Sequence, residues 1–173
     1  IPIATGLIDP AGHEVQATKV LEMTHAKQSF HFDGLAARPV ASILRGFSAP
    51  VILQQEMTND QRAFLLAHDT DPFNKWEAGR ALATDGLLAM LRDGAKPDQG
   101  YLDAIHKMAQ DTTLDPAFKA LALGLPSEDE LAQTMFDAGT TPDPSAIWQA
   151  LETLRQTRAE HMLDLARTIY DAH

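Results

Sequence analysis

Hydrophobic residues recur at helical spacing along the last two thirds of the chain, from Thr58 onward. Short polar loops separate the periodic stretches, and loops of this length favour antiparallel neighbouring helices. The pattern therefore predicts a stack of helical hairpins, with helices over residues 59–68, 72–93, 99–110, 116–123, 128–138 and 144–172. The second helix carries an apolar stripe of Phe73, Trp76, Ala83, Leu87, Met90 and Leu91, and the last carries Ile147, Leu151, Leu154, Met162, Leu165 and Ile169.

The residues at the expected helix ends support these boundaries. Thr58 with Gln61 and Ser127 with Glu130 match the capping box, in which each side chain covers an orphan backbone donor. Three Asp-Pro pairs place a carboxylate at the positive end of a helix dipole and a proline where no hydrogen bond is lost. These pairs are Asp71-Pro72, Asp115-Pro116 and Asp143-Pro144, and the expected helix stops are Gly94, Gly124 and Gly139.

The first 56 residues follow a different pattern, typical of β-strands. Turn residues such as Asp9-Pro10-Ala11-Gly12 and Asp33-Gly34 separate short apolar or alternating runs. We expect four or five antiparallel strands, over residues 1–8, 15–23, 28–32, 40–44 and 49–53. An immunoglobulin-type sandwich needs about seven strands in about 100 residues, so this segment predicts an incomplete sandwich. A missing N-terminal portion would explain both the shortage and the first residue, Ile1 rather than Met.

The composition excludes several kinds of partner and of chemistry for this chain. Lys and Arg number 14 and Asp and Glu 24, so the formal net charge is −10, which argues against nucleic acid and anionic membrane as partners. The chain has no Cys, which excludes disulfides, thiolate metal ligands and Cys nucleophiles, and suits a reducing compartment. No apolar run approaches the roughly 18 residues of a membrane span, and no signal peptide opens the sequence.

The candidate metal ligands have simpler interpretations. His13-Glu14 begins like the zinc motif H-E-x-x-H, but Ala17 stands where the second His must be, and the segment is expected to be strand rather than helix. His31 and Asp33 share one face of a predicted strand, without an evident third ligand. Helix-terminal or surface roles explain the others: His68 and Asp69 before the capping residue Asp71, His106 with Asp103, and His161 beside Glu160.

Neither phosphate-binding glycine loops nor a G-x-S-x-G elbow occur in the sequence. Trp76 and Trp148, both near helix starts, are expected to be core anchors rather than stacking platforms. The residue pattern by itself therefore gives a β-rich segment followed by a helical stack, with no visible catalytic site.

Several segments resemble bacterial aminopeptidase N, a family of zinc metallopeptidases. Residues 41–51, ASILRGFSAPV, are similar to its LLRGFSAPV segment, and residues 64–78, FLLAHDTDPFNKWEA, are similar to its HDxDPFNRWEA stretch. The likeness also covers residues 20–24 and 28–32, which match its VLELTEAEQTFTF strands, and continues through residues 114–117 and 122–128. The resemblance runs in order along essentially the whole chain.

The resemblance implies a domain organisation. Residues 1–56 correspond to the later part of the family's immunoglobulin-like β-sandwich, and residues 57–173 to the first part of its C-terminal α-helical superhelix of HEAT/armadillo-like repeats. It also implies what is missing. The family's zinc motif H-E-x-x-H with its distal Glu, its G-x-M-E-N loop and its catalytic Tyr have no counterpart here. No catalytic, cofactor-binding or metal-binding residue is therefore expected on this chain.

The resemblance thus implies an inactive, architectural fragment of a cytoplasmic zinc aminopeptidase that removes N-terminal residues from peptides. Zinc, peptide substrates and the remaining domains would belong to the parent enzyme, with the helical domain closing over its active site. Two alternatives remain open at this point: a free-standing helical-repeat module that binds a peptide or protein, and a small hydrolase whose site no motif shows. At the junction we expect Phe47 and Trp76 to be buried and to join the two domains.

Overall fold

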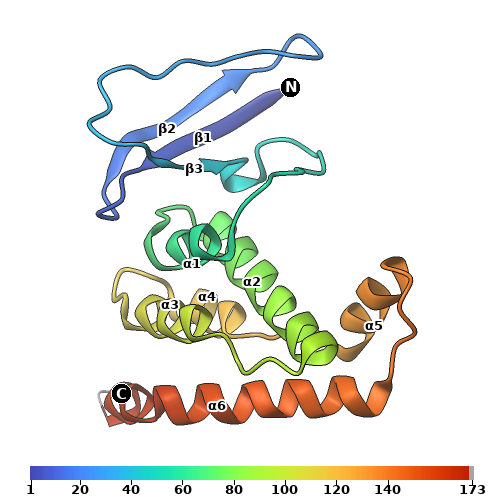
Figure 1. Ribbon diagram of the computed structural model, residues 1–173. Coiled ribbons are helices and arrows are strands. Elements are labelled where there is room, and N and C mark those ends of the chain that lie inside the picture. Colours follow the sequence, from blue (N-terminus) through green and yellow to red (C-terminus); the bar gives the residue numbers. More distant parts are fainter. Residues whose placement is uncertain (172–173) are drawn as a thin grey trace. The chain divides into compact units, whose positions relative to one another are not determined.

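A small antiparallel sheet opens the computed structural model, which describes residues 1–171 (Figure 1). Its strands are β1 (Pro2–Ile8), β2 (Glu14–Glu22) and β3 (Val40–Ile43), in the order β2-β1-β3. The turn between β1 and β2 is closed by hydrogen bonds from Gly12 N to Asp9 O, at 2.9 Å, and from Asp9 N to His13 O, at 2.8 Å. Gly12 has a φ of +89°, which explains glycine at this position.

Two expected strands are absent from the described residues, so the prediction of four or five was wrong. Residues 28–32 form no strand; instead the Gln28 side chain accepts from Thr24 N and donates to Glu22 O, holding a loop against the end of β2. Residues 49–53 include a tight turn from Val51 N to Ala49 O, and Ile52 is 93% exposed. A strand needs a partner edge as well as an apolar pattern, and neither segment has one here.

The six predicted helices are confirmed, with ends that agree to within one residue over the described part of the chain. They are α1 (Asn59–His68), α2 (Pro72–Asp93), α3 (Gln99–Gln110), α4 (Pro116–Ala122), α5 (Glu128–Asp137) and α6 (Pro144–Asp171). The expected end of the last helix at residue 172 lies outside the described residues. A three-residue 3-10 helix, η1 (Arg45–Phe47), follows β3.

The caps explain why local sequence placed these helices so well. Both capping boxes are present, at Thr58–Gln61 and Ser127–Glu130. Each Asp of the three Asp-Pro pairs accepts a hydrogen bond from a backbone N–H in the first turn of its helix. Since a cap involves residues within three positions of each other, it can be read without knowing the tertiary structure.

The chain divides into two compact units, Ile1–Ala78 and the part from Gly79 onward. The first unit contains the sheet, η1, α1 and the first residues of α2. The β-rich segment followed by a helical stack is confirmed within the described residues, whereas the expected domain boundary after residue 56 stays a prediction.

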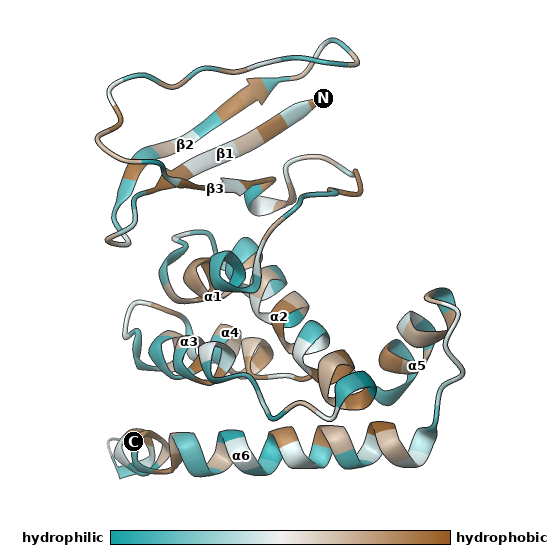
Figure 2. Ribbon diagram, viewed as in Figure 1, coloured by the Kyte–Doolittle hydropathy of each residue, from teal (hydrophilic) through white to brown (hydrophobic). Residues whose placement is uncertain are grey.

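The helical unit is packed by apolar side chains on the inward stripes of α2, α3, α5 and α6. Its fully buried residues include Leu87, Ile105, Met108, Leu131, Ile147 and Leu151. Arg158 on α6 adds a polar tie: it donates to Leu123 O at 2.7 Å and to the Tyr101 hydroxyl at 3.2 Å. Figure 2 shows hydrophobic and hydrophilic residues alternating along α6.

Two of the three aromatic positions expected to be core anchors differ from that expectation. Phe47 is 56% exposed, so its predicted burial was wrong; its ring contacts that of Phe73 with centroids 5.6 Å apart. Trp148 is 53% exposed, because the neighbouring Ile147 and Leu151 take the buried face of α6. Trp76 is half-buried, with its ring 6.1 Å from that of Phe73.

None of the described helices is long and apolar enough to cross a membrane.

Candidate functional site

The turn that follows β3 directs the Arg45 side chain into the first unit. Leu44 and Phe47 have φ angles of 62° and 53°, in the left-handed region that non-glycine residues rarely adopt, and Gly46 between them has a φ of 61°. Such backbone persists only where surrounding contacts enforce it. The result is that Arg45 is only 4% exposed while the adjacent Phe47 ring faces outward.

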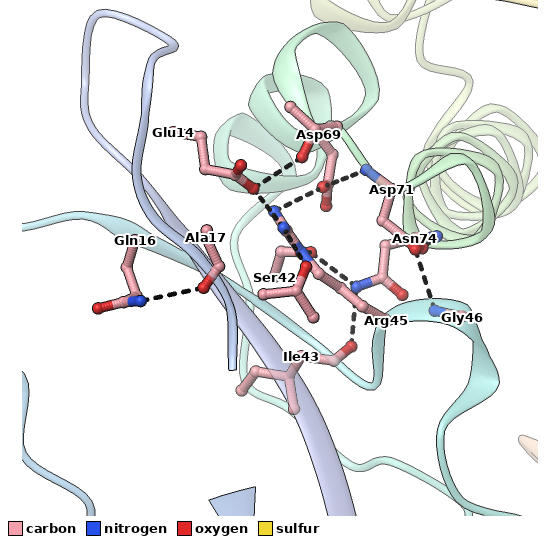
Figure 3. A network of polar contacts seen from close by, with 12 residues as sticks. Glu14, Gln16, Ala17, Ser42, Ile43, Arg45, Gly46, Asp69, Asp71 and Asn74 are labelled. Carbon is pink, nitrogen blue, oxygen red and sulfur yellow. Dashed lines mark hydrogen bonds and ion pairs between the residues drawn. The ribbon is translucent and has the colours of Figure 1, made fainter. Parts of the chain in front are cut away.

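Arg45 is the centre of a polar network (Figure 3). Its Nε donates to Ser42 Oγ at 2.9 Å, its Nη2 to Asp69 Oδ1 at 3.2 Å, and its Nη1 to Thr18 Oγ1 at 3.0 Å and to Glu14 Oε1. One guanidinium therefore joins β2, β3 and the segment between α1 and α2.

A second layer of hydrogen bonds closes the network around α2. Asn74 donates from Nδ2 to Ser42 Oγ and to Ile43 O, both at 2.8 Å. Asp71 caps α2 by accepting from Asn74 N at 2.9 Å, and its other oxygen accepts from Gly46 N at 3.0 Å. The start of α2 is thereby fixed to the same turn that holds Arg45.

Glycine in β1 makes room for the guanidinium. A Cβ atom built on Gly6 would lie 2.1 Å from Arg45 Cζ and 2.3 Å from Nη1, far inside van der Waals contact. The backbone of Gly6 is not in the left-handed region, so its role is close approach rather than conformational freedom.

The two carboxylates beside Arg45 experience opposite environments. Burial raises the pKa of the Asp69 carboxyl above its usual value, against the opposing effects of Ser42, the Asp71 N–H and the Arg45 charge. The Oδ2 atom of Asp69 is buried without a hydrogen-bond partner in the described structure. By contrast, the hydrogen bond from Arg45 lowers the pKa of Glu14, which lies nearer to solvent.

This arrangement clamps elements together and offers no room for a substrate. Ser42, Arg45 and Asp69 are 0%, 4% and 2% exposed. An arginine this well paired is neither a general base nor a nucleophile, and the buried Ser42 hydroxyl accepts from both Arg45 and Asn74. The geometry supports a structural role.

The residues singled out as possible metal ligands are not brought together. His13 pairs with Asp9 at 3.5 Å and is 78% exposed, whereas its neighbour Glu14 turns to Arg45. His31 and Asp33 lie in a segment without strand structure, so the predicted shared strand face was wrong. Among residues 1–171, no group of three or more His, Cys, Asp and Glu is placed to hold a metal ion.

His68, His106 and His161 make contacts of the helix-end and surface kinds that were expected, with one change of partner. His68 at the end of α1 stacks on Phe64, with ring centroids 4.7 Å apart. His161 Nε2 lies 3.3 Å from Asp103 Oδ1, and the His106 ring meets His161 edge-on at 5.5 Å. Asp103 therefore pairs across helices with His161 rather than with His106 on its own helix.

Sequence reasoning missed the network itself. Arg45 is a lone charged residue within an otherwise apolar run, and Asp69 is one of two carboxylates before α2, which were the available signals. In the structure, the two longest segments of the family resemblance, residues 41–51 and 64–78, meet at this network.

Comparisons with known proteins cover both parts of the chain. Residues 59–173 match the family described as "Domain of unknown function (DUF3458_C) ARM repeats", and residues 1–56 match "Domain of unknown function (DUF3458) Ig-like fold". Aminopeptidase N of Caulobacter vibrioides is 41% identical over 96% of this chain and 19% of its own length. Aminopeptidase N of Escherichia coli is 33% identical over 100% of this chain and 21% of its own length.

A solved structure adds a likeness in fold. The crystal structure of Legionella pneumophila aminopeptidase A in complex with aspartic acid has a TM-score of 0.77 and 27% identity, over 95% of this chain and 19% of that one. The chain thus spans about a fifth of the length of each relative. The resemblance to bacterial aminopeptidase N is confirmed, and the chain belongs to the DUF3458_C family of ARM repeats, preceded by a DUF3458 immunoglobulin-like segment.

Proposed function

We propose that this chain is a noncatalytic, architectural part of a zinc-dependent aminopeptidase that removes N-terminal amino acids from peptides. The observation that carries the proposal is the extent of the homology, which covers 96% of this chain but only 19% of its Caulobacter relative. The closed network around Arg45 supports a structural rather than a chemical role, because its central groups are buried and mutually paired.

Zinc does not fit the described residues. No three-ligand cluster exists within residues 1–171, and the one His-Glu pair, His13-Glu14, has its members turned to different partners. Zinc-binding residues would have to come from the part of the aminopeptidase outside this chain. The described residues supply no step of the hydrolysis.

The architectural role has a physical basis in the first unit. Arg45, Asn74 and Asp71 link strands β2 and β3 to the start of α2 by both side-chain and backbone hydrogen bonds. A buried network with specific geometry favours one arrangement of these elements over others. The partners in this proposal are the remaining domains of the enzyme, peptides are its substrates, and the cytoplasm is its compartment.

The test compares the 173-residue chain with the full-length enzyme. With aminoacyl-4-nitroanilide substrates and added zinc, we expect turnover only from the full-length enzyme, and no stoichiometric zinc on the chain after a chelator rinse. Turnover by the chain that survives repurification and disappears in His13→Ala or Glu14→Gln would overturn the proposal. Lack of aminopeptidase activity in the zinc-replete full-length protein would also overturn it.

A further inference from the structure

Helix α6 carries apolar residues on two faces. Its inner stripe contains Ile147, Leu151 and Leu154, each no more than 2% exposed, and packs within the helical unit. A second line of apolar residues runs along the outer face: Trp148, Ala159, Leu163, Ala166 and Tyr170. Leu163 lies 15 residues after Trp148 and 7 before Tyr170, or about 4.2 and about 1.9 turns at about 3.6 residues each, so the three residues lie within about 60° of one another around the helix.

These outer residues are solvent-exposed to an unusual degree. Trp148, Leu163 and Tyr170 are 53%, 47% and 83% exposed. Together with Ile169 they are four of the six large exposed hydrophobic side chains in the described part of the helical unit. Two charged residues that pair at 3.5 Å, Glu152 and Arg155, interrupt the line between Trp148 and Ala159.

The helix α3 provides a contrast within the same unit. Its buried residues, such as Leu102, Ile105 and Met108, form one inward stripe, while Asp103 and Lys107 are polar positions between them. A helix with one apolar stripe buries that stripe and exposes its other face to solvent. A helix with two apolar stripes can bury both only if it packs against a neighbour on each side. In the described structure only the inner stripe of α6 is covered.

We propose that the outer stripe of α6, defined by Trp148, Leu163 and Tyr170, is the docking surface for a further amphipathic α-helix from the part of the aminopeptidase outside these 173 residues. The inference rests on the proposed function. Apolar residues that follow one face of a helix are matched by the apolar face of another helix. In ARM repeats each repeat packs on its neighbours, and this chain spans about a fifth of its relatives.

A second copy of this chain is the less suitable occupant. Each copy has a formal net charge of −10, which opposes self-association.

The absence of cysteine allows a direct test of the stripe by maleimide labelling. Leu163→Cys places a thiol on the outer stripe, and Asp164→Cys places a matched control at the next residue of α6, which is exposed and points about 100° away from Leu163 around the helix. Labelling rates are measured by mass spectrometry of the modified peptide, in the 173-residue chain and in the full-length aminopeptidase. Tyr170→Cys serves as a second stripe variant if Leu163→Cys fails to fold.

We expect both thiols to label readily in the 173-residue chain. In the full-length enzyme the stripe thiol is expected to react at least about tenfold more slowly, with the Asp164→Cys rate unchanged, because labelling then requires the docked helix to open. Equal rates for the stripe thiol in both proteins would overturn the inference. Protection in the 173-residue chain that rises with its concentration, together with a dimer by sedimentation, would assign the stripe to a second copy and also overturn it.

Aminopeptidase activity of the same full-length samples separates the two proposals. An active enzyme with an unprotected stripe thiol contradicts the docking surface alone. A zinc-replete but inactive full-length protein with a protected stripe thiol contradicts the proposed function and leaves the helix contact standing.

Discussion

The two compact units are stabilised in different ways, as their central arginines illustrate. Arg45 in the first unit is 4% exposed and contacts two carboxylates, one of them fully buried. Arg158 in the helical unit is half-buried and donates to two neutral oxygens, at the edge of an apolar core. Removal of the Arg45 side chain would leave the buried Asp69 carboxylate without its cation, whereas removal of the Arg158 side chain would remove only hydrogen bonds.

The difference follows from what each unit can bury. A three-stranded sheet with an exposed edge strand β2 offers little apolar surface, so its join to α1 and α2 depends on polar contacts. Helices with continuous inward stripes bury Leu87, Ile105 and Leu151 completely and need few such contacts. A buried polar network requires every partner, while an apolar core loses stability by degrees.

The largest expected effect comes from Arg45→Met. The variant leaves the Asp69 carboxylate buried without its cation, which typically costs about 3–5 kcal/mol of unfolding free energy. Chemical denaturation with Trp76 as the reporter for the first unit, in a Trp148→Phe background, measures this loss. Arg158→Met, followed through Trp148 in a Trp76→Phe background, is the control and should cost about 1–2 kcal/mol.

Equal losses in the two arginine variants would contradict the distinction between the units. Adding Asp69→Asn to Arg45→Met should recover part of the stability, because it removes the uncompensated charge. No recovery would mean that packing, rather than charge, dominates at this position.

In the helical unit, Leu151→Ala should cost about 2–5 kcal/mol, since it opens a cavity at a fully buried position. Leu163→Ala, on the exposed face of the same helix, should change the unfolding free energy of the 173-residue chain by no more than about 0.5 kcal/mol. Thermal denaturation of both variants makes the comparison. Similar losses would show that the outer stripe is already part of the core.

Replacement of a glycine by alanine should change the stability of the two units in opposite directions. Gly6→Ala should destabilise the first unit by about 1–3 kcal/mol, because the new methyl group displaces the Arg45 guanidinium. Gly86→Ala lies inside α2 with its nearest neighbour, Asp98 Cβ, at 3.9 Å, and should stabilise the helix by about 0.5–1 kcal/mol. A double-mutant cycle of Gly6→Ala with Arg45→Met should show strong non-additivity; additive costs would contradict the close approach.

The smallest expected effect is a pH dependence at the surface of the helical unit. Backbone and side-chain hydrogen bonds from Ser127, together with Arg80, lower the pKa of Glu130 to about 2 from 4.5. Its stabilising contribution is therefore present above pH 4.5 and is lost as the pH falls towards 2. Wild type should exceed Glu130→Gln in stability at pH 6, and the difference should vanish near pH 2.

Asp69 in the first unit should behave in the opposite sense. Because its folded-state pKa is raised above 3.8, its contribution favours folding at low pH and is lost as the pH rises through the folded value. Asp69→Asn in the Arg45→Met background, compared with Arg45→Met alone across pH 3–7, isolates this effect. A stability gain that does not grow with pH would contradict the raised pKa.

Local sequence was enough to predict the helices but not the sheet or the network. Thr58, Asp71 and Ser127 cap helices through residues within three positions, so the boundaries of α1, α2 and α5 could be read directly. The segments 28–32 and 49–53 have apolar residues but no strand partner, and pairing is a property of distant segments. The hydrophobicity of Phe47 predicted a buried side chain, but the left-handed backbone of Leu44 and Phe47 leaves the ring 56% exposed.

Inspection of the sequence was sufficient to recognise the class of the two segments, the six helices with their caps, and the resemblance to aminopeptidase N. Each of these features depends on residues that are close in the sequence or on segments whose sequence is similar to that of the family. The network around Arg45 became visible only in the folded chain, where Gly6, Glu14, Ser42 and Asp69 surround the guanidinium and Asn74 binds Ser42. A buried guanidinium needs several hydrogen-bond acceptors at fixed angles. Here the acceptors come from different segments, and the most distant of them, Glu14, lies 31 residues from Arg45 in the sequence.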